Sequence, residues 1–222
     1  MTAQGFYELK VPDVGSEQWS LANQDAEYFV ETKGTASIVR KASPKEVDVT
    51  QITYQTNGVK YIGVDDGEFG GGLYLNSYDA KKAPYMKGNI RALIPIGKDL
   101  YILEGLAHMG INRGSIHVIR NCATPSRPER MTLLPSAPEA VLVEAASNLT
   151  RIVIVGSDSL MIFWPDDLLE MLHQNAFWYS LYPTSIVKDG SSYLIGIRSG
   201  IAVVTGMPFG RSTVRYFRPK KP

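Results

Sequence analysis

The sequence predicts an all-β fold, and three observations lead to that prediction. A pattern of two apolar strands joined by a polar turn recurs five times, at Tyr28–Arg40, Lys60–Leu75, Leu100–Ile119, Arg151–Phe163 and Ser192–Val204. Successive copies start about 32, 40, 51 and 41 residues apart. Their turns are rich in Gly, Asp, Asn and Ser, which accept the positive φ of tight hairpins. Small sheets repeated at this period bury both faces only by stacking on neighbours, so we expect a five-bladed β-propeller.

The composition is that of an ordinary globular chain. Five blades of about 40 to 45 residues would use nearly all of the 222 residues, so a single domain over residues 1–222 is expected. The formal net charge of +1 provides no basic face for nucleic acid. No apolar run approaches the roughly 20 residues that cross a bilayer. We therefore expect neither a nucleic-acid partner nor a membrane partner.

The cysteine count and the N-terminal residues bear on the compartment. Cys122 is the only cysteine, so no intramolecular disulfide can form, which fits a reducing compartment. Residues Met1–Glu8 lack the basic and apolar regions of a signal peptide. The expectation is a cytoplasmic protein, or a periplasmic one if a signal peptide has been removed.

The N-terminal part of the chain predicts a closing strand and two blades. Residues 6–11 alternate like a strand and are expected to pair with residues 213–217, because a propeller has to cover its open edge. The first blade turns at Gly34. The second has the strongest turn signals of the chain, Asn57-Gly58 and Asp65-Asp66-Gly67.

The three later blades follow from the same alternation of apolar strands and polar turns. The third takes strands at 90–95, 99–104 and 115–119, the fourth at 140–143, 151–155 and 159–164, and the fifth at 183–187, 192–197 and 201–204. Between the last two, residues 166–175 predict one short helix. Asp166 and Asp167 would cap its first turn, and leucines recur on one face.

Two segments carry a family resemblance. Residues 181–201 and 58–76 resemble the repeat unit of propellers of the NHL, gluconolactonase and two-component-sensor kinds: a strand ending in an Asp-Gly turn, a strand ending in glycine, and a short turn into the next strand. Those families use six or seven blades. The resemblance to lactonases implies a central metal held by carboxylates and amides from several blades, and this sequence shows no complete corresponding set.

The most unusual segment is the octet from Asp65 to Gly72, which places three carboxylates beside three consecutive glycines. It could be a turn followed by a bulged strand that packs tightly, a rim that a partner approaches closely, or a Ca²⁺ site. The ligand spacing of an EF-hand is absent. No Lys-Ser/Thr and no helix follow, so a phosphate loop is not expected.

No catalytic motif accompanies these features. His108, His117 and His173 offer no local ligand pair for zinc, and the sequence contains no Gly-x-Ser-x-Gly. Glu104 with His108 four positions later is the best acid–base candidate. The alternative interpretation is a strand end that carries polar groups into water.

Aromatic residues gather on both sides of the predicted helix, at Phe163-Trp164 and from Phe177 to Tyr182. They would either lock this helix against the neighbouring blades or anchor a partner. Asp166, Asp167 and Glu170 would give them an acidic edge.

Together these observations predict a non-catalytic binding module for a protein partner, without a cofactor and without a metal. The expected partner-binding residues are Asp65, Asp66, Glu68, Trp164, Asp166, Asp167, Trp178 and Tyr182. By context such a protein resembles bacterial immunity proteins, which would neutralise a toxin by covering its active site. The alternatives are a metal-dependent lactonase or hydrolase that uses the carboxylates of the octet, and a scaffold subunit of a larger complex.

Overall fold

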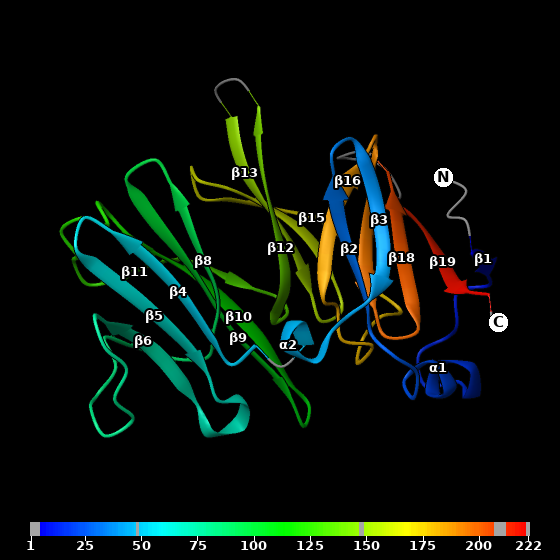
Figure 1. Cartoon of the computed structure of the whole chain (residues 1–222), viewed down its shortest axis with the longest axis horizontal. Coiled ribbons are helices and arrows are strands. Elements are labelled where there is room, and N and C mark those ends of the chain that lie inside the picture. The colour runs from blue at the N-terminus through cyan, green and yellow to red at the C-terminus, as the bar shows by residue number, and fades with distance from the viewer. Residues whose placement is uncertain (1–4, 48, 147–148, 207–211, 221–222) are drawn as a thin grey trace. The chain divides into compact units, whose positions relative to one another are not determined.

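A computed structural model describes residues 5–47, 49–146, 149–206 and 212–220. The chain folds into two compact units (Figure 1). The first unit comprises Met1–Val47 and Glu139–Pro222, and the second comprises Asp48–Pro138. Antiparallel strands dominate both units, so the predicted all-β class is confirmed.

The first unit contains three sheets and two short helices. The helices are α1 (Glu17–Ala22) and α2 (Pro44–Val47). The five-stranded sheet has the order β1 (Phe6–Leu9), β19 (Thr213–Pro219), β18 (Gly200–Thr205), β17 (Ser192–Ile197) and β16 (Ser185–Asp189). A four-stranded meander runs through β12 (Pro138–Ala146), β13 (Leu149–Gly156), β14 (Leu160–Trp164) and β15 (Leu168–His173). The third sheet has only two strands, β2 (Tyr28–Lys33) and β3 (Ala36–Lys41).

The predicted pairing of the terminal strands is confirmed. β1 lies antiparallel to β19, with Phe6 opposite Pro219 and Leu9 opposite Tyr216. This pairing covers the edge that β19 would otherwise expose, as unpaired edges are prone to non-native pairing.

The second unit contains two four-stranded meanders. One runs through β4 (Gln51–Thr56), β5 (Val59–Asp65), β6 (Gly71–Leu75) and β7 (Met86–Lys87), with the 3₁₀ turn η1 (Gly67–Phe69) between β5 and β6. The other runs through β8 (Ile90–Ile96), β9 (Asp99–His108), β10 (Ile111–Ile119) and β11 (Glu129–Leu134). The predicted Asn57-Gly58 turn joins β4 to β5, and both residues have positive φ.

Each unit has its own apolar core. In the second unit, Tyr61 and Leu73 pack with Leu100, Ile102 and Ile119, all of them buried. In the first unit, a cluster built from β13, β14, β17 and β18 surrounds Trp178, which is fully buried. Alternation places these residues on the inner face of each strand, as a period-2 pattern requires.

The helix predicted at 166–175 is wrong. Leu168–His173 forms β15, which pairs with β14 over its whole length. Asp166 and Asp167 occupy the hairpin turn between these strands, where Asp167 has a φ of 74° and its N–H donates to the Trp164 carbonyl. Hydrogen bonds and apolar contacts with the buried strand β14 stabilise this segment as a strand. They contribute more free energy than the helical preference of its leucines, because tertiary context overrides propensity.

The interpretation of the repeat as equal propeller blades also needs correction. Each of the five copies does fall in a separate sheet, but the sheets differ in strand number. The sheet of the first copy has two described strands, those of the second, third and fourth copies have four, and that of the fifth copy has five. The predicted first blade is only the β2–β3 hairpin, which lies against β16, β17 and β18. A strand pair that recurs in the sequence predicts hairpins and their turns. The number of further strands that join each hairpin depends on tertiary packing. Five separate antiparallel sheets are what the structure shows.

Candidate functional site

The octet from Asp65 to Gly72 forms a compact turn at the end of β5. Asp65 Oδ1 accepts the Gly67 N–H at 3.0 Å. The Asn89 amide clamps the turn from the neighbouring segment, since its Oδ1 accepts the Asp66 N–H at 3.3 Å and its Nδ2 donates to the Gly67 carbonyl at 2.8 Å. A Cβ at Gly71 would overlap the Val64 carbonyl oxygen. Tight packing therefore explains the glycine, while the β5–β6 ladder is regular rather than bulged.

Two of the three carboxylates of this turn already face nitrogen partners. Asp65 forms an ion pair with Arg91 at 2.8 Å, and Glu68 Oε2 lies 2.8 Å from His108 Nε2. Asp66 is exposed. Across the part of the chain that the structure describes, no group of three or more His, Cys, Asp or Glu residues could hold a metal ion.

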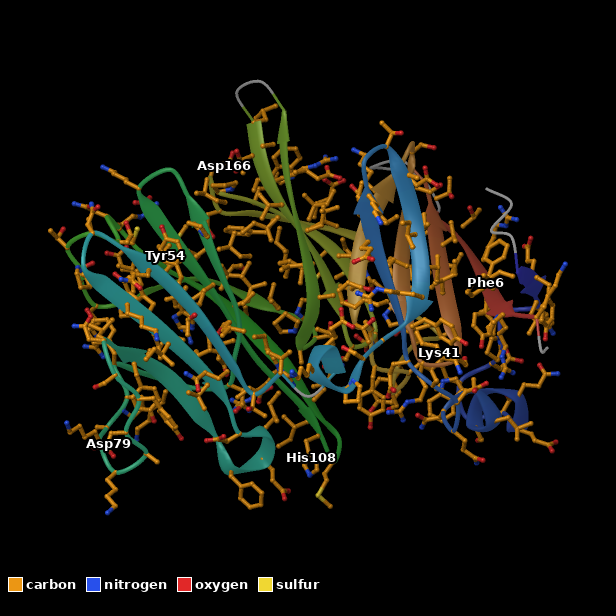
Figure 2. All side chains as sticks on the ribbon, in the orientation of Figure 1. Phe6, Lys41, Tyr54, Asp79, His108 and Asp166 are labelled. Atoms are coloured by element: carbon orange, nitrogen blue, oxygen red, sulfur yellow. The ribbon has the colours of Figure 1, made fainter. Side chains whose placement is uncertain are left out.

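Two large apolar side chains stand out from the same end of the second unit. Phe69 at the end of η1 and Met109 in the β9–β10 turn are each 88% exposed. η1 lies against β9, and the contact between Glu68 and His108 joins the two loops. Figure 2 shows His108 at the tip of β9.

We call these loop residues the η1 surface: Asp66, Glu68, Phe69, His108, Met109 and Ile111. Ile111 sits opposite His108 in the β9–β10 ladder and is half exposed. An apolar group of this size rimmed by charges is typical of a protein-binding surface.

Sequence analysis missed Phe69, Met109 and Ile111. Phe69 lies between an acidic turn and three glycines, and this local position alone does not show whether a distant segment covers its ring. Met109 precedes Gly110 in a two-residue hairpin turn, with φ of 47° and 85° at the two positions. A large apolar residue in such a turn points away from both strand faces.

The remaining predicted partner residues lie in the first unit. Trp164, Asp166 and Asp167 share the β14–β15 end, where both aspartates are exposed, and Figure 2 labels Asp166. Arg151 stacks on the Trp164 ring at 5.2 Å. Tyr182 is half exposed, and Arg198 covers its ring at 4.3 Å.

Trp178 does not offer an anchor. It is fully buried, its Nε1 donates to the Gly156 carbonyl at 3.1 Å, and Phe177 packs against it edge to face. Of the two sequence interpretations for these aromatics, core packing holds at this position.

The structure does not bring together Glu104 and His108, the acid–base candidate of the sequence: His108 lies against Glu68. Glu104 instead accepts a hydrogen bond from the Ser115 hydroxyl at 2.7 Å, and Ser115 Oγ also lies 2.9 Å from His117 Nε2. The three side chains project from one face because Ser115 stands directly opposite Glu104 in the β9–β10 ladder. The pKa of His117 is lowered, chiefly by burial. The Arg130 charge lowers it further, and the Glu104 charge opposes both by raising it.

This trio differs from a catalytic triad in what the acid touches. In a triad the carboxylate orients the histidine, whereas here carboxylate and histidine both contact the serine. The Ser115 side chain is also closed off, with 5% of the residue exposed. The trio therefore satisfies buried polar groups within the sheet.

We predict that Ser115→Ala lowers the free energy of unfolding by about 1 to 3 kcal/mol, because Glu104 and His117 both lose their partner. Urea unfolding followed by intrinsic fluorescence measures the change. The matched control is Ser77→Ala at an exposed serine of the same unit, for which almost no change is expected. Equal midpoints for the two variants would contradict the structural role of the trio.

Cys122 is a buried free cysteine. Its carbonyl accepts the Tyr61 hydroxyl at 2.7 Å, and its Sγ lies 3.9 Å from the Tyr54 hydroxyl. Burial, together with the neighbouring cysteine, raises the pKa of Tyr61 to about 12. These contacts place Cys122 within the core of the second unit.

Comparisons with known proteins provide no relative from which function could be transferred. The predicted resemblance to NHL and gluconolactonase propeller repeats is wrong, because the chain forms separate antiparallel sheets of unequal strand number instead of propeller blades. No family model matches the chain. No curated protein matches it either. Among solved structures the chain is similar to the computationally designed Ika8 protein in its crystal packing No.1 in P63, at 10% identity and a TM-score of 0.30. That match covers 84% of this chain and 79% of the other, and a score this low supports no inference. No helix among the described residues is long and apolar enough to cross a membrane.

Proposed function

We propose that the chain is a non-catalytic binding module that recognises a protein partner through the η1 surface of its second unit. The observation that carries this proposal is the pair Phe69 and Met109, each 88% exposed on adjoining loops. Exposed side chains of this size are unfavourable in water unless another surface covers them. A partner would therefore gain most of its binding free energy from these two residues.

The loops that carry this pair are held in place before binding. The Asn89 amide clamps η1, and the Glu68–His108 contact joins η1 to the β9–β10 hairpin. Preorganised loops lose little conformational entropy on association, which favours affinity. The surface therefore has both the apolar centre and the rigidity of a binding site.

The charged rim indicates what kind of partner would fit. Asp66 is exposed, and Glu68 is about half exposed beside His108. An apolar pocket bordered by lysines or arginines would complement this rim and speed encounter at low salt. Binding there would act sterically, by covering the surface of the partner.

The narrower prediction, neutralisation of a bacterial toxin in the cytoplasm, depends on the identity of the partner and stays a prediction. The single reduced cysteine, Cys122, is compatible with a cytoplasmic location. The enzymatic alternative would have used Asp65 and Glu68, which face Arg91 and His108.

We expect the double variant Phe69→Ser/Met109→Ser to bind its partner at least about 30-fold more weakly, with an unchanged melting temperature. The partner would be recovered with the wild-type chain, and affinity would then be measured by calorimetry on the purified pair. Leu133→Ser is the matched control, since Leu133 is also largely exposed in the second unit. Unchanged affinity of the folded double variant would refute the assignment of this surface.

The rim is tested separately by Asp66→Lys, because Asp66 is exposed whereas Asp65 pairs with Arg91. This change should lower the association rate constant and flatten its dependence on salt. The dissociation rate constant should change little.

A further inference from the structure

We propose that the free edge of β3 binds an extended peptide segment of a partner, whose inward side chains fill an adjoining pocket of the first unit. Within the described residues, the β2–β3 sheet has two strands, whereas every other sheet has at least four. An isolated two-stranded hairpin is marginally stable and has two edges that can accept further strands. The two edges of this hairpin are treated differently by the rest of the unit.

The outer edge of β2 is partly occupied by side chains of Thr184 and Ser185, at and just before the start of β16. Ser185 Oγ accepts the Val30 N–H at 2.8 Å, and Thr184 Oγ1 donates to the Tyr28 carbonyl at 2.5 Å. These bonds hold β2 over the five-stranded sheet. An incoming strand would have to displace these two bonds at this edge.

The outer edge of β3 pairs with no strand among the described residues. Antiparallel ladders alternate between pairs that exchange hydrogen bonds and pairs that do not. Ala42 donates to the Glu27 carbonyl at 2.9 Å, which sets this alternation along the hairpin. It directs the backbone N–H and C=O groups of Ser37, Val39 and Lys41 away from β2. The Lys41 carbonyl already accepts a hydrogen bond from Arg40 Nη1 at 3.3 Å, and the other five groups form a row that another strand can bond.

A pocket lies on the sheet face that the hairpin only partly covers. Val30 and Val39 pack on the apolar face of the five-stranded sheet, together with Leu194, Val203 and Phe217. The two strands of the hairpin leave part of the five-stranded sheet uncovered. A cavity of about 300 Å³ lies on this sheet face. The cavity is lined by Asp189, Gly190, Ser191, Ser192, Leu194, Ile201, Val203, Thr205, Arg215 and Phe217.

The charges in this pocket indicate which side chains it would accept. Arg215 is already bound by Glu8, with Nε 3.0 Å from Oε1, and it stacks on Phe217 at 4.8 Å. Asp189 is exposed and forms no ion pair with any residue in the described ranges. The pocket therefore has an apolar floor, a neutralised arginine and one carboxylate available for a cation.

An extended peptide would use both the free edge of β3 and the pocket. Main-chain hydrogen bonds to β3 would supply affinity, and alternate side chains would enter the pocket, as in strand addition to other sheet edges. Successive inward residues of a strand are about 7 Å apart. The expected segment alternates polar residues with an apolar residue over Leu194 and Phe217 and a Lys or Arg near Asp189. This site belongs to the first unit and is independent of the η1 surface.

The experiment selects decapeptides from a random phage-displayed library on the full chain. We expect enriched sequences with alternating apolar and polar positions and a Lys or Arg. The synthetic form of the most enriched peptide is then the probe, and fluorescence anisotropy measures its affinity. Recovery of no binding peptide would overturn the proposal.

Two variants test the two halves of the site. Ser37→Pro removes an outward N–H without touching the bonds to β2, and it should weaken peptide binding at least tenfold. Asp189→Ser should weaken binding about fivefold and abolish the preference for Lys or Arg, whereas the control Asp13→Ser should have no effect. Wild-type affinity in folded Ser37→Pro would overturn strand addition.

Hydrogen exchange provides a readout that pocket binding alone would not change. Saturating peptide should protect the amides of Ser37, Val39 and Lys41. Bound peptide without this protection would overturn the proposal, as would protection that arises without peptide in a dimer detected by sedimentation. The Phe69→Ser/Met109→Ser variant should bind the peptide normally, so failure at one surface is distinguishable from failure at the other.

Discussion

Replacing Trp178 with alanine should lower the free energy of unfolding by about 3 to 5 kcal/mol, the largest effect expected of any single substitution in this chain. Trp178 is fully buried, and its indole contacts Phe177 and His173. Truncation removes this apolar contact area and leaves a cavity that the neighbouring strands cannot fill. It also leaves the Gly156 carbonyl without the indole N–H.

Urea unfolding followed by circular dichroism measures this loss. The control is Trp164→Ala, because Trp164 is only partly buried beneath Arg151 and should contribute less. If Trp178→Ala unfolds no earlier than Trp164→Ala, Trp178 is not the core residue that the structure shows. A weaker partner affinity in a fully stable Trp178→Ala protein would restore it as an anchor.

Gly196→Ala should lower the free energy of unfolding by about 3 kcal/mol and loosen the β2–β3 hairpin. A Cβ at Gly196 would overlap the Tyr28 carbonyl oxygen and lie 2.7 Å from Ser185 Oγ and 2.8 Å from Thr184 Oγ1. The Ser185 and Thr184 oxygens are the atoms that hold β2 on the sheet. The added methyl group therefore has to displace the hairpin.

Hydrogen exchange at the Val30 amide checks this mechanism directly, since that amide donates to Ser185. We expect faster exchange in Gly196→Ala. Gly34→Ala, at the tip of the same hairpin where a Cβ would meet open space, should cost less and leave Val30 protected. Slow exchange at Val30 in Gly196→Ala would show that β2 tolerates the methyl group, contrary to the packing described.

Part of the candidate binding region could be predicted from the sequence. The octet from Asp65 to Gly72 was recognised by its composition, and a partner-binding rim was one of its three interpretations. Phe69 and Met109 were not recognised, because an isolated apolar residue in a sequence gives no sign of whether another segment covers it. The eight predicted residues also divide between the two units, which no local pattern could show.

The trio of Glu104, Ser115 and His117 illustrates the same limit. Its members are 11 and 2 residues apart in sequence, and their contacts arise from the register of β9 against β10. Register depends on which faces are buried and on the Met109-Gly110 turn, and a shift of one residue would separate Glu104 from Ser115. The nearby His108 was a plausible partner by sequence distance, yet it faces Glu68 instead.

The sequence by itself determined the all-β class, most strands of the repeated hairpins, the Asn57-Gly58 turn and the pairing of the terminal strands. These features depend on local alternation and on the φ preferences of turn residues, which each segment carries with it. Tertiary structure alone decided that Leu168–His173 is a strand, that no other described strand joins the β2–β3 hairpin, and that a pocket opens on the sheet face it partly covers. Each of these depends on which distant segment supplies hydrogen bonds and apolar contact, and that competition among segments is not encoded in any one of them.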